Sequence, residues 1–125
     1  MILQVSDSEL ELMKIVWASG GSALYAQIME EQGKAGRDWQ QNTVSTLLSR
    51  LVEKGLLKTS KLGRRNRYTA LVSEGDYQAA QTQTLLNKLY AGDARGLVST
   101  LIQRELLSPE DYEELKKFWQ KGEEE

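Results

Sequence analysis

Basic side chains gather in one short stretch of this 125-residue sequence, and their types and spacing suit the binding of phosphate. Between Arg50 and Arg67 there are seven cations and a single anion, Glu53. The seven are Arg50, Lys54, Lys58, Lys61, Arg64, Arg65 and Arg67. Arginine donates to phosphate oxygens in a planar fork, and lysine approaches them as a compact charge. Because the whole chain carries a formal net charge of -2, the excess is local and indicates contact with a polyanion.

The residues just before this stretch could read a nucleic acid. Apolar residues recur there at helical spacing, at Val44, Leu47, Leu48, Leu51 and Val52. The opposite arc of the same helix carries short polar side chains and an arginine, namely Asn42, Thr43, Thr46 and Arg50, with Ser45 and Ser49 at its edge. Such groups donate to phosphates and to base edges. The alternative, a plain solvent-exposed face with small polar residues, is less favoured once the basic stretch is considered with it.

The residue types exclude several other kinds of site. The sequence has no cysteine and no histidine. It therefore lacks disulfides, Cys/His zinc sites, cysteine nucleophiles and the commonest general base. No pair of carboxylates is flanked by phosphate-binding glycines. We therefore expect no enzyme, no metal site and no cofactor.

Helix-start signals indicate which elements position these side chains. Ser6 with Glu9 and Ser73 with Asp76 have the spacing of capping boxes, and Ser108 precedes a proline that suits the first helical position. We expect helices at 7–18, 25–32 (ending at Gly33), from about 40 to Gly55, and at 74–90, 94–106 and 109–121, before an acidic tail at 123–125.

Two strands are expected after the third helix, at 56–62 and 66–71, around a turn at Gly63. A short extended piece is expected at 22–24. Three helices followed by a hairpin predict a winged helix-turn-helix, in which the third helix enters the major groove of DNA. Arg64, Arg65 and Arg67 would then lie near the tip of the wing, beside the DNA backbone. We accordingly predict a mainly α fold with a small β wing.

Charge divides the chain into two parts. Residues 1–72 hold ten Lys/Arg and seven Asp/Glu, whereas residues 73–125 hold six and eleven. Such asymmetry indicates that only the first part meets a polyanion. We therefore expect a DNA-binding domain over 1–72 and a helical domain over 73–125. The alternative function is a winged-helix protein–protein interaction module, although such a module would expose apolar residues on the third helix and wing.

Apolar residues in the second part predict self-association. They recur on helices too short to bury them alone, and they include Leu85, Leu89, Leu97, Leu101, Leu115 and Phe118. Burying such residues between two chains contributes about 25 cal/mol per Å². The sequence therefore predicts a homodimer held by its C-terminal helices.

The sequence predicts a cytoplasmic protein without membrane insertion. Its longest apolar runs are only a few residues long, far short of a spanning helix. Charged residues such as Asp7 and Glu11 interrupt the first 17 residues, which differ in this from a signal peptide.

Several stretches together resemble the BlaI/MecI/CopY family of bacterial winged-helix repressors. They are "SDSELELMKIVW", "WQQNTVSTLLSRLVEKGLL", "YTALVSEGDY", "LLNKLYAGDARGLVSTLI" and "LSPEDYEELKKF". The resemblance implies a homodimer that represses genes, such as those of antibiotic resistance, from double-stranded DNA with inverted-repeat operators, often with TACA/TGTA half-sites. Asn42 stands where the family often has a lysine. Because the copper branch has a Cys-rich motif that is missing here, the chain resembles the penicillinase repressors.

The resemblance also implies a route of release. In the β-lactam branch, a membrane sensor-transducer leads to cleavage within the fifth helix, after which the dimer dissociates. An ungapped alignment places the cut between Thr100 and Leu101, where characterised members have an Asn-Phe bond. The alternative is that this segment serves only as interface core.

Overall fold

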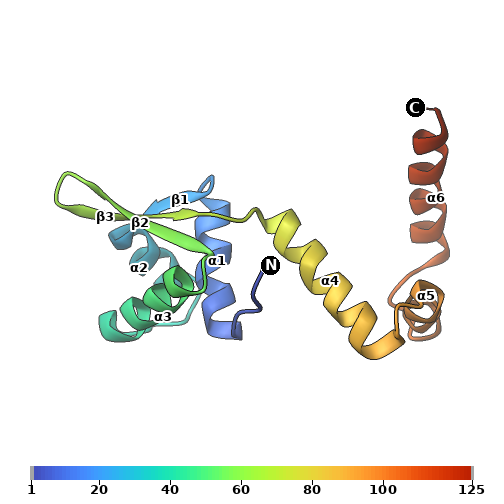
Figure 1. Cartoon of the computed structure of the whole chain (residues 1–125), viewed down its shortest axis with the longest axis horizontal. Coiled ribbons are helices and arrows are strands. Elements are labelled where there is room, and N and C mark those ends of the chain that lie inside the picture. Colours follow the sequence, from blue (N-terminus) through green and yellow to red (C-terminus); the bar gives the residue numbers. More distant parts are fainter. Residues whose placement is uncertain (1, 125) are drawn as a thin grey trace. The chain divides into compact units, whose positions relative to one another are not determined.

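The computed structural model describes residues 2–124, with side chains through residue 120. Its elements, in chain order, are α1 (Asp7–Ala18), β1 (Ser22–Leu24), α2 (Tyr25–Lys34), α3 (Gln41–Glu53), β2 (Leu57–Leu62), β3 (Arg65–Ala70), α4 (Glu74–Tyr90), α5 (Ala94–Gln103) and α6 (Pro109–Glu124). The predicted fold class, mainly α with a small β wing, is confirmed (Figure 1). Of the acidic tail expected at 123–125, the last residue lies outside the described part of the chain.

The three strands form one antiparallel sheet in the order β1-β3-β2. Leu62 pairs with Arg65, so the β2–β3 turn consists of Gly63 and Arg64. Gly63 has φ +65°, a left-handed conformation that glycine adopts without strain, and glycine at the first central position is typical of a type II′ hairpin turn. The hairpin of β2 and β3, which we call the wing, extends beyond the helices of this unit (Figure 1).

The core of the N-terminal unit lies between the sheet and the first three helices. Its buried side chains include Leu12 and Val16 of α1, Ile28 of α2, and Leu57 of β2. On α3 the predicted apolar stripe is confirmed, because Val44, Leu47, Leu48 and Leu51 are buried and Val52 is half-buried. This packing fixes the rotation of α3 about its own axis and leaves the opposite arc exposed.

The predicted helix starts are confirmed by the hydrogen bonds of their capping residues. The Glu9 amide donates to Ser6 Oγ at 3.2 Å, and the Ser6 amide donates to Glu9 Oε1 at 3.0 Å. At α6, Ser108 and Asp111 exchange the same two bonds, both at 3.0 Å. At α4 the Asp76 amide donates to Ser73 Oγ at 3.0 Å. Each bond satisfies an amide that the first helical turn leaves unpaired.

Three helix ends differ from the prediction, and one of them is that of α6, which continues to Glu124 instead of ending at residue 121 before a separate acidic tail. α2 continues through Gly33 to Lys34, because a glycine inside a helix costs only about 1 kcal/mol, and the left-handed glycine is instead Gly36. α5 ends at Gln103 rather than at residue 106. There Glu105 adopts φ +60°, and the amide of Leu106 turns back to Leu101 O at 2.8 Å.

The chain divides into two compact units, residues 1–81 and residues 82–125, which meet inside α4. We call them the N-terminal and C-terminal units. The expected boundary lay at 72/73, but the first turns of α4 pack on the N-terminal unit. Tyr77 is 6% exposed, and its hydroxyl accepts the Val5 amide at 3.1 Å. Its ring lies 5.8 Å from that of Trp17, whose indole donates to Val72 O at 2.9 Å.

The described side chains of the C-terminal unit form no comparable core. Among the described side chains from residue 78 to residue 120, none is buried. α4 and α5 contact each other through Tyr90, whose hydroxyl donates to Thr100 Oγ1 at 3.0 Å. No helix in the described part of the chain is long and apolar enough to cross a membrane.

Candidate nucleic-acid interface

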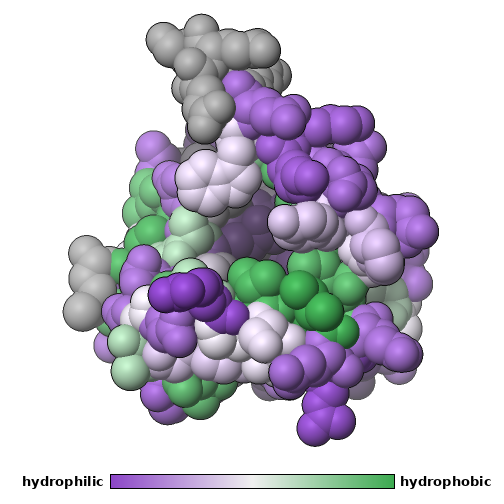
Figure 2. All heavy atoms as spheres, turned by 90° about the vertical axis from the view of Figure 1, so that its right-hand side faces the viewer, coloured by the Kyte–Doolittle hydropathy of each residue, from purple (hydrophilic) through white to green (hydrophobic). Residues whose placement is uncertain are grey.

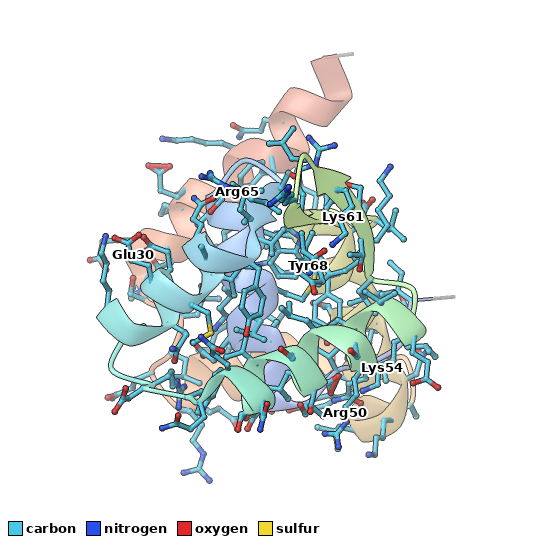
Figure 3. The ribbon with its side chains drawn as sticks, turned by 90° about the vertical axis from the view of Figure 1, so that its left-hand side faces the viewer. Glu30, Arg50, Lys54, Lys61, Arg65 and Tyr68 are labelled. Carbon is cyan, nitrogen blue, oxygen red and sulfur yellow. The ribbon has the colours of Figure 1, made fainter. Side chains whose placement is uncertain are left out.

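The exposed arc of α3 carries the side chains that the sequence predicted to contact DNA. Asn42, Thr43, Thr46 and Arg50 are all exposed. Arg50 forms no ion pair with any described acidic residue, so its guanidinium is free to bind an external acceptor. Thr46 Oγ1 donates to Asn42 O at 2.9 Å, so its hydroxyl proton is used within the helix and its oxygen can still accept a hydrogen bond. Figure 3 shows α3 and Arg50 from this side of the unit.

Two side chains from α2 hold the start of α3, where the N-cap residue Gln40 makes no capping bond of its own. Gln32 is 4% exposed, accepts the Trp39 amide at 2.8 Å, and donates to Trp39 O at 3.2 Å. The Tyr25 hydroxyl donates to Gln41 O at 3.2 Å. The interface helix is therefore anchored at its beginning by contacts that sequence reasoning did not predict.

The wing brings its three arginines to different positions. Arg64 lies in the turn, Arg65 begins β3, and both are exposed without ion pairs to described residues. Arg67 is half-buried, and its Nε donates to Ser60 Oγ at 3.2 Å on the neighbouring strand. The structure thus groups Arg64 and Arg65 near the tip, whereas Arg67 lies further back along the sheet.

Lys54 is engaged within the protein. Its ammonium donates to Glu9 Oε1 at 2.8 Å, and Glu9 is only 2% exposed. Burial alone would raise the pKa of Glu9, but the bonds from Lys54 and Ser6 outweigh it and lower that pKa below the ordinary value of 4.5. The basic stretch therefore offers one cation fewer to a ligand than its sequence suggests.

Two tyrosines join the candidate interface without having been predicted. Tyr68 belongs to β3 and lies on the side of the wing that is nearer to α3 (Figure 3). Burial and the neighbouring Tyr25 raise the pKa of Tyr68, so its hydroxyl stays protonated and can donate. Tyr25 also contacts Ser45 Oγ at 3.2 Å. Because side chains alternate along a strand, Tyr68 and Ala70 lie on the same face of β3, and both pack against the core. This alternation in the sequence could have indicated that Tyr68 faces the helices.

Apolar side chains predicted to mediate dimerisation are exposed on the C-terminal unit. Figure 2 shows hydrophobic side chains on the face formed by the C-terminal helices. Leu89 is 66% exposed and Phe118 is 72% exposed, and Leu85 and Leu115 are exposed as well. Leu97 and Leu101 are half-buried. Such exposure leaves a large apolar surface without a partner in the single chain.

The bond between Thr100 and Leu101 lies inside α5. Thr100 O accepts the Arg104 amide at 3.0 Å, and Thr100 Oγ1 donates to Gly96 O at 3.1 Å. Proteases bind extended backbone, so this bond is protected as long as α5 stays formed.

The comparison with known proteins decides the family. The family described as "Penicillinase repressor" matches residues 5–121 of the chain. The chain belongs to the penicillinase repressor family. It is 35% identical over 114 residues to the penicillinase repressor of Bacillus licheniformis, covering 91% of this chain and 88% of that protein. It is 30% identical over 118 residues to the methicillin resistance regulatory protein MecI of Staphylococcus aureus, covering 94% of each.

Solved structures of this family agree with the fold. The DNA-binding domain of the repressor BlaI is 39% identical and superposes with a TM-score of 0.54, covering 62% of this chain and 92% of that one. Monomeric BlaI of B. licheniformis in complex with the blaP half-operator is 38% identical, with a TM-score of 0.53 and the same coverage. The winged helix-turn-helix prediction is thereby confirmed. These relatives are named as a repressor and a regulatory protein, which agrees with the expectation that this chain is not an enzyme.

Proposed function

We propose that this protein is a homodimeric transcriptional repressor that binds a palindromic DNA operator through α3 and the wing. The observation that carries the proposal is the exposed arc of α3, which combines amide, hydroxyl and guanidinium groups beside a basic wing. That α3 and the wing expose such groups favours DNA over a protein partner. The BlaI complex with a half-operator, from the same family, supports DNA as the ligand.

Each element has a separate task in this proposal. α3 enters the major groove, where Asn42, Thr43, Thr46 and Arg50 meet base edges and adjacent phosphates. Arg64, Arg65 and Arg67 bind phosphates without reading sequence. Because Asn42 carries no charge where the family often has a lysine, we expect one phosphate contact fewer at this position.

The lack of buried side chains among those described in the C-terminal unit supports the proposed dimer. Isolated helices without tertiary packing are marginal in water, and none of the described side chains from residue 78 to residue 120 is buried. A second copy of the chain would cover the exposed apolar side chains of α4, α5 and α6. A two-fold dimer places two α3 helices on two half-sites, and the operator should therefore be an inverted repeat.

The test is selection of bound duplexes from a random-sequence library by the full-length protein. We expect an enriched inverted repeat that binds more tightly than a shuffled duplex by about 10³-fold or more. Sedimentation at micromolar concentration should show a dimer. Recovery of no common sequence, with affinity that is independent of salt, would contradict the proposal and favour a protein-binding module.

We further propose that cleavage in α5 releases the operator, through a sensor pathway like that of the β-lactam branch. Cutting between Thr100 and Leu101 would separate Leu97 from Leu101 and the whole of α6. The two halves of the dimer surface would then lose the effective concentration that a continuous chain provides.

A further inference from the structure

The two faces of the wing follow from its register. On β3, Tyr68 pairs with Ala23 on one side and with Thr59 on the other. Ala23 is buried in the core, and so is Leu57, two residues before Thr59. Since side chains alternate along a strand, the inner face of the wing carries Leu57, Thr59, Lys61, Asn66, Tyr68 and Ala70. The outer face carries Lys58, Ser60, Leu62, Arg65, Arg67 and Thr69.

Hydrogen bonds agree with this division. On the outer face, Arg67 Nε reaches Ser60 Oγ at 3.2 Å, and Ser22 Oγ meets Thr69 Oγ1 at 3.1 Å. On the inner face, Tyr68 packs against the core. Arg65 and Arg67 therefore lie on the face that turns away from the helices.

The inner face is the one directed toward α3. Tyr68 neighbours Tyr25, and the hydroxyl of Tyr25 contacts both Gln41 O and Ser45 Oγ of α3. Toward the tip, beyond Tyr68, this face continues with Asn66 and Lys61, which pair across the strands. Lys61 is exposed and has no ion pair with a described residue, and Tyr68 has no hydroxyl partner among them.

We propose that Lys61, Asn66 and the Tyr68 hydroxyl form a second row of DNA contacts, which bind backbone phosphates between α3 and the wing. The proposal rests on the proposed function, because DNA lying against the exposed arc of α3 passes along the inner face of the wing. Lys61 supplies the charge, Asn66 an amide donor and Tyr68 a neutral hydroxyl donor. These groups position the protein on DNA and are not expected to distinguish one base from another.

The wing itself offers a matched control. Lys58 and Lys61 are both exposed lysines on β2, three residues apart and on opposite faces. Lys61→Ala and Lys58→Ala therefore remove the same charge from the same strand. Affinity is measured at several salt concentrations, on the selected palindrome and on a shuffled duplex of equal length. Thermal melting of both variants checks that they stay folded.

We expect Lys61→Ala to weaken binding to both duplexes by about three- to tenfold and to reduce the salt slope by about 0.9. Lys58→Ala should reduce the slope less than Lys61→Ala does, because Lys58 pairs with Thr69 at the base of the wing, on the outer face and away from Arg64 and Arg65 at the tip. Tyr68→Phe keeps the packed ring and should weaken binding by about two- to tenfold without changing the slope, because a neutral donor releases no counterion.

The failures of the two proposals can be told apart. Equal effects of Lys58→Ala and Lys61→Ala, in a protein that still prefers the palindrome, would overturn the inner-face row alone. Loss of any preference by the wild-type protein would instead overturn the proposed function.

Discussion

At the level of single residues, two cations near the end of α3 differ in what they can bind. Arg50 is exposed and unpaired with described acids, whereas Lys54, one turn further on, is bound to the buried Glu9. Two cations four residues apart thus have different tasks, decided by what each one contacts.

Arg50→Ala should lower affinity for the selected palindrome by about 1–3 kcal/mol, because a bidentate contact to a guanine would be lost. Binding to a shuffled duplex should change less. Gel-shift titration on both duplexes measures the ratio. An equal loss of affinity for both duplexes would indicate that Arg50 contacts a phosphate instead of a base.

Lys54→Met should destabilise the fold by about 1–3 kcal/mol at pH 7, because the Glu9 carboxylate stays buried without its main partner. In the wild-type protein the pKa of Glu9 is lowered, so its stabilisation is present above 4.5 and is lost as pH falls through the folded-state pKa. Without Lys54, burial should raise that pKa instead.

The stability difference between wild type and Lys54→Met should therefore be largest at pH 7 and shrink toward pH 4. Urea denaturation across this range measures it. The salt slope of DNA binding should stay unchanged, and a reduced slope would contradict the assignment of Lys54 to a structural role.

At the level of elements, α4 belongs to both units. Its first turns carry Tyr77 into the N-terminal core, while its later turns belong to the C-terminal unit. A helix shared in this way gives the DNA-binding unit a longer sequence than the charge pattern predicted.

A fragment of residues 1–81 should be more stable than a fragment of residues 1–72 by about 3 kcal/mol, because the shorter one loses the buried Tyr77 ring. Within the longer fragment, Tyr77→Phe should cost about 1 kcal/mol through loss of the bond to Val5. Urea unfolding monitored by tryptophan fluorescence tests both. Equal stability of the two fragments would show that α4 contributes nothing to the fold.

α5 sets the accessibility of the proposed cleavage bond. Tyr90→Phe removes the hydrogen bond to Thr100 and should favour opening of α5 by about 1 kcal/mol, so cutting at Thr100–Leu101 should accelerate about two- to tenfold. Mass spectrometry of protein recovered from cells exposed to a β-lactam measures the fragments, with Tyr112→Phe as control. Intact protein after full derepression would rule out this route.

At the level of the whole molecule, one chain contains one complete core and one unit without buried side chains among those described. The N-terminal unit buries its apolar residues within itself. The C-terminal unit exposes them, which is the state expected of half an interface.

Phe118→Asp should convert the dimer to a monomer at micromolar concentration, since it would place a charge in the proposed apolar interface. Lys117→Asp, on the same exposed helix, changes the charge by more but should leave the dimer intact. Sedimentation measures both, and binding to the palindrome should weaken only with Phe118→Asp. If both variants remain dimers, α6 is not part of the dimer interface.

The sequence alone determined the features that depend on local spacing. The apolar stripe of α3, the helix starts at Ser6, Ser73 and Ser108, and the turn at Gly63 all follow from side-chain periodicity and hydrogen bonding within a few residues. The same apolar periodicity also predicted which face of α3 is exposed, because the face opposite the buried stripe must point to solvent.

Only the tertiary structure decided which distant groups meet. The Lys54–Glu9 pair joins residues 45 positions apart, and the bond of Tyr77 to Val5 spans 72. The division of the wing into an inner and an outer face required the register of β2, β3 and β1 together. Long-range packing of this kind depends on the whole fold, because the free energy of each contact is gained only when both segments are already in place.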